Sequence, residues 1–350
     1  MNLYLNSIFL FVIFLMFFIV PNVVHYGVNM ADTVPGNMII TLYFLLLYGV
    51  IAITLSNTKK ITTLYLVVIF AFFISGGTIH SALFGLMLMM FVENLITSRE
   101  APFLNAFKYI FLLNLSISIF QILGISDLFY YHLIYIGDVN SHTNILNLDY
   151  LASLDFGIFS TAQLRPAGIF PSTIYYGFFH LIFLTLLFFS KKIKHVWYFL
   201  YAFSAAISGS SLLFLMVIFL FFIGAYNKRV LVIPLAYLFF MFCIYYFQSD
   251  WFFRNYKIET LINSFLSRDL GSLIQILSDN WITIIALIGM TFSFWIKFSK
   301  YIFAVAILII PLIVHNLFHS VGYLLLFGIL VSYGSIFPKW AAKKIYITHP

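Results

Sequence analysis

The chain has 350 residues, of which 63% are hydrophobic, 21% aromatic and only 8% charged, and its mean hydropathy is +1.06. A soluble domain cannot hide that much apolar surface, so the composition excludes a soluble protein. The formal net charge of +7 is spread over short turns without a basic cluster, which argues against a nucleic-acid partner. The single cysteine, Cys243, excludes an internal disulfide and a thiolate metal cluster.

Apolar runs long enough to cross a bilayer recur along the whole chain. A helix needs about 20 apolar residues to cross about 30 Å of hydrocarbon. The first run lacks a basic leader and a small-residue cleavage site, so it is predicted as a helix and not as a signal peptide. In chain order, the predicted spans are residues 3–21, 38–55, 61–76, 79–96, 102–124, 171–190, 195–208, 211–226, 230–247, 281–296, 301–315 and 319–337.

The predicted fold class is therefore all-α, a polytopic membrane helix bundle of about twelve transmembrane helices in one domain, residues 1–350. Neighbouring spans meet with almost no loop at Gly76 and Gly77, at 208–211 and at 315–320, which indicates tight hairpins or a broken helix. Two segments outside the spans are long enough to carry function, residues 125–170 and 248–280.

The basic residues predict the orientation. When the spans alternate through the bilayer, one side receives only Arg165, Arg254, Lys257 and Arg268. The other side receives Lys59, Lys60, Arg99, Lys108, Lys191, Lys192, Lys194, Lys228, Arg229, Lys297, Lys300, Lys339, Lys343 and Lys344. By the positive-inside rule the richly basic side is cytoplasmic, so both termini are inside and both long loops face outward. An anionic inner leaflet suits this distribution.

Arg165 stands in the run QLRPAGIFPSTIYYGFF, just before the chain enters the membrane again. A guanidinium group meets phosphate oxygens through two parallel hydrogen bonds, so Arg165 is a candidate ligand for a phosphate or diphosphate. The alternative is an arginine that reaches lipid phosphates or pairs with Asp155. Arg254 and Arg268 in the second outer loop, which has an amphipathic pattern, raise the same choice, and Arg254 ranks first.

His315 and His319 lie at the outer end of a span, in the run PLIVHNLFHSVGYLLLFGIL. Imidazole accepts and returns a proton near neutral pH, so His315 is the candidate general base and His319 a candidate binding residue. The alternatives are a histidine bonded to a helix-end carbonyl and a metal pair; no carboxylate accompanies the pair locally, so no metal is predicted. His180, in the middle of a span, is expected to be neutral and bonded to a neighbouring Tyr or Ser.

Several familiar motifs are absent from the sequence. It has no Walker loop, dinucleotide fingerprint, Gly-x-Ser-x-Gly elbow or His-Glu-x-x-His motif. No cytoplasmic domain is predicted that could use nucleotides, and no cofactor is expected. Any reaction must therefore run on the outer side, on a substrate that arrives activated and held in the membrane.

Three runs resemble segments of the O-antigen polymerase and ligase superfamily, the Wzy-type polymerases and their ligase relatives. QLRPAGIFPSTIYYGFFHLIFLTLLFF resembles the Arg-x-x-Gly-x-Phe segment that leads into a helix, and SGSSLLFLMVIFLFFIG is similar to the Ser-rich turn and the helix after it. HNLFHSVGYLLLFGIL resembles the late His-Asn stretch before a Gly-containing helix. The order of the three runs, the two outer loops and the number of spans fit this family.

The resemblance implies a GT-C-like membrane fold and metal-independent, inverting glycosyl transfer between polyprenyl-diphosphate-linked oligosaccharides on the periplasmic face of a bacterial inner membrane. Arg165 with Arg254 or Arg268 would hold the diphosphate, and His315 would take the proton from the acceptor hydroxyl. The expected partners are the lipid-linked oligosaccharide, membrane lipids and a chain-length regulator protein. An O-antigen ligase and a flippase or transporter of lipid-linked oligosaccharides are the alternatives.

Overall fold

The computed structural model describes residues 6–15, 79–122, 168–170, 173–190, 192–224, 228–247, 302–309 and 321–335, and the single positions 49, 69 and 249. The regular structure of these residues is helical throughout, which confirms the all-α class for this part of the chain. The labelled helices are α4 (Ile79–Ile122), α8 (Thr173–Phe189), α9 (Val196–Ser208), α10 (Ser211–Gly224), α11 (Val232–Phe247) and α17 (Val321–Ser335). Residues 6–15 and 302–309 form two further helices.

The helix bounds follow the predicted spans to within a few residues. Helices α8, α9, α10, α11 and α17 each lie inside one predicted span, and α4 covers two of them. The predicted spans 38–55, 61–76 and 281–296 lie outside the described residues, apart from positions 49 and 69. By length and composition one described helix, Ala82–Phe120, could cross a membrane, and the shorter apolar helices have 10–17 residues. The total of about twelve spans therefore stays a prediction.

Helix α4 consists of two arms that join at Arg99. The backbone of Arg99 has φ −140° and ψ 42°, outside the helical region. Pro102 follows within the same helix and has no N–H to donate to the carbonyl of residue 98. On the preceding turn, the Thr97 hydroxyl donates to the Glu93 carbonyl at 2.8 Å. The sequence around residues 97–102 thus interrupts an otherwise continuous helix.

One aromatic ring shows that the two arms of α4 fold toward each other. The centroid of the Phe14 ring lies 6.2 Å from that of Phe91 in the first arm and 4.9 Å from that of Phe107 in the second. In a straight helix residues 91 and 107 would be about 24 Å apart along the axis, too far for one ring to contact both. Each arm alone is about 30 Å long, which matches the hydrocarbon thickness. The break therefore divides α4 into the two elements that the sequence predicts.

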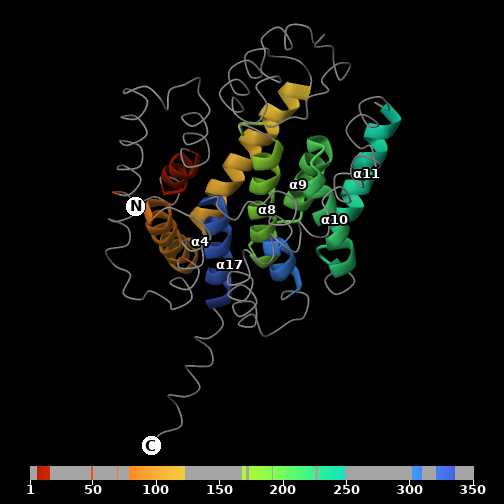
Figure 1. The fold of residues 1–350 in the computed structure, drawn as a ribbon. Coiled ribbons are helices and arrows are strands. Elements are labelled where there is room, and N and C mark those ends of the chain that lie inside the picture. Colours follow the sequence, from red (N-terminus) through yellow and green to blue (C-terminus); the bar gives the residue numbers. More distant parts are fainter. Residues whose placement is uncertain are drawn as a thin grey trace, which may run out of the picture.

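Helix α8 lies between α4 and α17 on one side and α9, α10 and α11 on the other (Figure 1). Helix α17 packs against α4 and α8, while α11 packs against α9 and α10. Along α8, the residues from Tyr176 to Leu187 are almost all buried, on every face of the helix. A helix that is apolar all round belongs in the interior of a bundle, so α8 is the central element of the described helices.

Helices α8 and α17 run in the same direction. Near their starts, Phe178 of α8 lies against Gly322 of α17. Near their other ends, the hydroxyls of Ser190 and Tyr333 both donate to Oε1 of Glu100, at 3.1 and 3.3 Å. We call this end of the bundle the Glu100 end. The opposite end, where α8 and α17 begin just after Gly168 and residue 320, is the Gly168 end.

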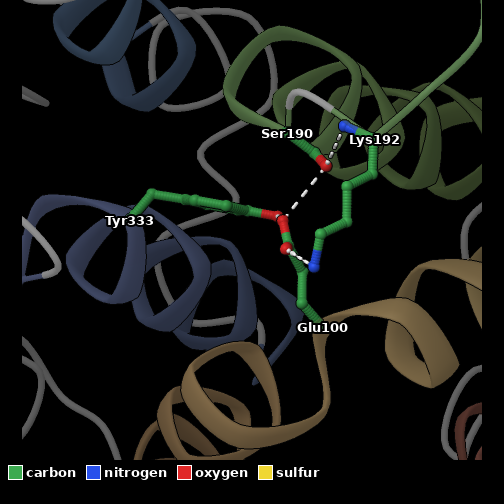
Figure 2. A network of polar contacts seen from close by, with 4 residues as sticks. All are labelled: Glu100, Ser190, Lys192 and Tyr333. Carbon is green, nitrogen blue, oxygen red and sulfur yellow. Dashed lines mark hydrogen bonds and ion pairs between the residues drawn. The ribbon is translucent and has the colours of Figure 1, made fainter.

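Polar contacts at the Glu100 end join three helices. Figure 2 shows Ser190, Lys192 and Tyr333 meeting the carboxylate of Glu100, which lies beside the break in α4. Lys192 Nζ lies 2.6 Å from Glu100 Oε2, and the Lys192 amide donates to Ser190 Oγ at 3.2 Å. The lysine side chain is 59% exposed, so the ion pair itself adds no more than about 1 kcal/mol. Its main effect is to hold the end of α8, the end of α17 and the break in α4 together.

Glycine allows α17 to approach the first arm of α4. A Cβ on Gly328 would lie 3.0 Å from the Cα atom of Met89, and one on Gly85 would overlap with Cδ1 of Leu324. Small residues at helix contacts are typical of bundles in membranes, where close backbone approach replaces the hydrophobic driving force. The sequence of α17, VGYLLLFGIL, therefore suits a helix packed closely against a neighbour.

Large apolar side chains remain exposed on the outside of the described helices. The exposed fractions are 68% for Phe222 on α10, and 62% for Phe239, 64% for Phe242 and 74% for Phe247 on α11. Such a surface is unfavourable in water and stable against lipid chains. The membrane location stays a prediction from the composition.

We expect Gly328→Leu to destabilise the protein, because a side chain at this position must push α17 away from α4. Overpacking of this kind costs about 1–3 kcal/mol, and thermal unfolding of the purified protein in detergent measures it. Gly49→Leu is the matched control, since no atom lies within 4 Å of a Cβ built on Gly49. Equal unfolding midpoints for Gly328→Leu and wild type would contradict the contact between α17 and α4.

Candidate functional site

The predicted site residues Arg165, Arg254, Arg268, His315 and His319 all lie outside the described residues, as do both long loops apart from their edges. The structure therefore neither brings these five residues together nor separates them. It does describe the chain just after two of them. Gly168 comes three residues after Arg165, and Gly322 comes three residues after His319.

Residues 168–170, the first described residues after Arg165, form a turn against α4. Gly168 has φ +62°, in the left-handed region that favours glycine. The next amide, that of Ile169, donates to Oδ1 of Asn114 at 3.0 Å. Phe170 is 1% exposed, and its ring centroid lies 5.2 Å from that of Phe179 in α8. The Arg-x-x-Gly-x-Phe run is thus held in place at its glycine, at the following amide and at its phenylalanine.

Two independent reasons require glycine at position 168: the side chain of Asn114 and the backbone conformation. A Cβ at residue 168 would overlap with Oδ1 of Asn114, and an L side chain at φ +62° is also strained. Asn114 itself is fully buried, and its Nδ2 atom has no hydrogen-bond partner among the described residues. One amide donor beside the turn is therefore available for a ligand oxygen or a buried water.

The Ser-rich turn before α10 and the first turn of α17 both lie against residues 177 and 178 of α8. A Cβ on Gly177 would lie 2.8 Å from Oγ of Ser210, in the Ser-rich turn between α9 and α10. A Cβ on Gly322, in the first turn of α17, would lie 2.7 Å from Cε1 of Phe178. These are the runs that carry the family resemblance, and the structure places them in contact at the Gly168 end.

The Ser-rich turn is tight, as the sequence predicts. Helix α9 ends at Ser208, and Gly209 has φ 59° in the left-handed conformation that terminates many helices. The Ser208 hydroxyl donates to the Ala205 carbonyl at 2.7 Å and accepts from the Ser210 amide at 3.2 Å. The Ser208 hydroxyl thus links the last turn of α9 to the residue before α10, which begins at once at Ser211.

His180 forms a buried chain of hydrogen bonds between α8 and α9. Its Nδ1 lies 2.9 Å from the Tyr176 carbonyl, which can only accept, so Nδ1 carries a proton. In the neutral ring Nε2 then accepts from the Ser204 hydroxyl at 2.8 Å. Ser204 Oγ lies 2.5 Å from the Tyr176 hydroxyl, which completes the chain by donating to it. The predicted bonding of a neutral His180 to a neighbouring Tyr or Ser is confirmed.

The contacts of His180 assign it a structural role. Its side chain is 0% exposed, and both ring nitrogens are bonded to protein atoms. Its ring also stacks on that of Tyr176, with centroids 4.2 Å apart and planes 18° apart. A group so enclosed joins helices and has no position left for a substrate.

Sequence reasoning missed Asn114 and Ser204. Both lie inside apolar runs, IFLLNLSISIF and YAFSAAIS, where a polar residue is costly unless it has a partner. That cost was the available signal. The partners themselves, the Ile169 amide and the His180 ring, lie 55 and 24 residues away in the chain, and sequence spacing does not reveal such contacts.

Within the described residues no group of three or more His, Cys, Asp or Glu side chains could hold a metal ion. Comparisons of the chain with protein-family models, with curated proteins and with solved structures found no match. The function is therefore argued from the residues and from the contacts between them.

We expect Ser204→Ala to cost about 1–3 kcal/mol, because Nε2 of buried His180 loses its donor. Ser118→Ala is the matched control: Ser118 is also buried, but its hydroxyl donates only within its own helix, to the Asn114 carbonyl at 2.8 Å. Thermal unfolding of both variants in detergent gives the comparison. A loss for Ser204→Ala no larger than that for Ser118→Ala would refute the proposed hydrogen-bond chain.

We also expect Gly168→Ala to lower stability, and part of the loss to depend on Asn114. Asn114→Ala removes the clash with the asparagine side chain but leaves the carbonyl of residue 114 at 3.0 Å from the new Cβ and the strain at φ +62°. In a double-mutant cycle Gly168→Ala should therefore cost at least about 0.5 kcal/mol less in the Asn114→Ala background. Equal costs in the two backgrounds would mean that the turn does not rest on Asn114.

Proposed function

We propose that this protein is a membrane glycosyltransferase of the O-antigen polymerase type, which joins oligosaccharide repeat units carried on polyprenyl diphosphate. It acts at the periplasmic face of a bacterial inner membrane, in a polytopic bundle with both termini in the cytoplasm. The observation that carries the proposal is the contact among three runs: the Ser-rich turn and the start of α17 both lie against residues 177 and 178 of α8, which belong to the first run. They are the same three runs that resemble one superfamily in sequence, and nothing in their spacing along the chain requires them to meet.

The Gly168 end is the proposed outer, reactive end of the bundle. Arg165 and His319 each stand three residues before a glycine that packs on the bundle at this end, Gly168 on Asn114 and Gly322 on Phe178. A segment held at its glycine limits how far the residues just before it can move. The two anchored glycines thus support a single site that includes both segments.

The chemistry needs an anion-binding group and a base. In the proposed reaction the acceptor hydroxyl attacks the anomeric carbon, and the bond from that carbon to the diphosphate oxygen breaks with inversion. The leaving diphosphate keeps the electron pair, and Arg165 with Arg254 or Arg268 stabilises its charge without reorganisation. His315 takes the proton from the attacking hydroxyl. No metal or other cofactor is needed for this step.

The membrane supplies much of the remaining rate enhancement. Donor and acceptor are both held by polyprenyl chains, so they meet at high effective concentration in a fixed orientation. The growing polymer is the donor, and a new repeat unit is the acceptor. A chain-length regulator protein is a further proposed partner.

The two alternatives predict different observations. An O-antigen ligase would use the same residues but needs a lipid A core acceptor. A flippase or transporter needs polar groups that line a path through the membrane. The polar chain of His180, Ser204 and Tyr176 lies in the middle of α8 and α9 but is completely buried and bonded to itself, which favours a structural role over a path.

The test is polymer formation by the purified protein supplied with lipid-linked repeat units alone. We expect wild type to produce a ladder of products without added lipid A core and in the presence of a metal chelator. His315→Ala and Arg165→Ala should reduce the rate by about 100-fold or more, as is typical for the loss of a general base or an anion-stabilising group. Arg165→Lys should restore little, because lysine lacks the bidentate geometry.

The matched control is Arg229→Ala. Arg229 is an exposed arginine before α11, near Tyr198, whose hydroxyl donates to the Leu187 carbonyl in the last turn of α8. It lies far from the proposed reactive end, so its removal should leave the ladder unchanged. Full activity of both Arg165→Ala and His315→Ala at normal protein levels would refute the site. Products formed only when lipid A core is added would favour the ligase.

A further inference from the structure

Two lysines at the Glu100 end lie close to each other and to an aromatic ring. Nζ of Lys108, in the second arm of α4, lies 5.5 Å from the ring centroid of Trp197, in the first turn of α9. The Lys194 carbonyl accepts from the Trp197 amide at 3.1 Å, so Lys194 precedes the same turn of α9, and its charge acts unfavourably on that of Lys108. Within the described residues neither lysine has a carboxylate at ion-pair distance. Bringing two cations together costs free energy unless an anion joins them.

One of the two carboxylates among the described residues is already engaged. Glu100 accepts from Ser190 and Tyr333 and forms its ion pair with Lys192. Glu93, the other carboxylate among the described residues, lies in the first arm of α4 and is in no ion pair with Lys108 or Lys194. The charge of this lysine pair is therefore not balanced by an acidic side chain of the described residues.

The start of α9 adds positive potential at the same place. His195 is the N-cap residue, and no side chain makes a capping hydrogen bond there. The first turn of a helix carries partial positive charge, so an anion is favoured beside it. This contribution is secondary to that of the two lysines near Trp197.

Apolar side chains next to the lysines indicate which kind of anion fits. On α4, Leu112 lies one turn after Lys108 on the same face and is 39% exposed. On α9, Val196 and Phe199 follow Lys194 and are 54% and 51% exposed. A free phosphate or nucleotide would leave these apolar side chains in contact with water. An amphiphile covers them with its chains while its phosphate meets the lysines.

We propose that Lys108, Lys194 and Trp197 bind the head-group phosphate of an anionic phospholipid, whose acyl chains lie along the apolar side chains of α4 and α9. The ammonium groups donate to the phosphate oxygens, and the tryptophan ring lies at the level of the head groups, where such rings are enriched. The location at the Glu100 end agrees with its proposed cytoplasmic side, where anionic lipids attract basic residues. This inference depends on the membrane location and not on glycosyl transfer.

The experiment measures lipid binding by the full-length protein in detergent. Phosphatidylglycerol should raise the midpoint of thermal unfolding more than phosphatidylcholine does, because only the former carries a net negative charge. Lys108→Gln and Lys194→Gln should each weaken apparent phosphatidylglycerol binding about tenfold, the value expected for one lost charge-assisted hydrogen bond. Lys194 is exposed, so its substitution should not affect folding.

Lys228→Gln is the matched control, since Lys228 is also exposed and the change in charge is identical. It should keep the full response to phosphatidylglycerol. Equal loss in all three variants would indicate a general charge effect and would overturn the site, as would an unchanged response in both Lys108→Gln and Lys194→Gln. Stabilisation by millimolar inorganic phosphate, equal to that by the lipid, would overturn the assignment to an amphiphile. Polymerase activity does not enter this test.

Discussion

The described structure depends on close contacts at glycine positions around α8 and α17. Gly177 leaves room for Ser210, Gly322 for Phe178, and Gly328 for the backbone of Met89. In a membrane the hydrophobic effect does not drive helices together, so association depends on close packing and on hydrogen bonds. A glycine at such a contact lets segments distant in sequence approach the central helix to within van der Waals distance. The proposed site requires the same contacts, because they bring its flanking segments to one end of the bundle.

Polar groups in the described helices are arranged by the cost of burying them. Near the middle of α8, the chain of His180, Ser204 and Tyr176 is completely enclosed and bonded to itself. At the Glu100 end, one carboxylate binds a lysine and two hydroxyls, with partial exposure to solvent. A polar group without a partner is costly in hydrocarbon. The apolar length of the helices therefore carries few polar groups, and the candidates for binding lie near their ends.

The two ends of the bundle suit different ligands. At the Gly168 end, the turn held by Asn114 leads back to a single arginine, and the first turn of α17 leads back to the histidine pair, which suits a lipid-linked sugar diphosphate in our proposal. At the Glu100 end, lysines beside a tryptophan and exposed apolar residues suit a lipid head group. Both proposed ligands combine a phosphate with long hydrocarbon chains. Helix α8, packed against α9 and α17, extends from one position to the other.

The sequence by itself determined the all-α class and, to within a few residues, the bounds of the described helices. An apolar run of about 20 residues is enough to indicate a helix, because helix formation depends on residues close together in the chain. The sequence also predicted the break between the arms of α4, the tight turn at Gly209 and the bonding of His180. It did not identify Asn114 as the residue that holds the Gly168 turn, nor Ser204 as the partner of His180. It did not predict that the Ser-rich turn and the start of α17 both contact residues 177 and 178 of α8. Only the tertiary structure decided these contacts, since each of them joins positions at least 24 residues apart in the chain. Hydropathy records that a helix faces an apolar environment but not which neighbour it contacts.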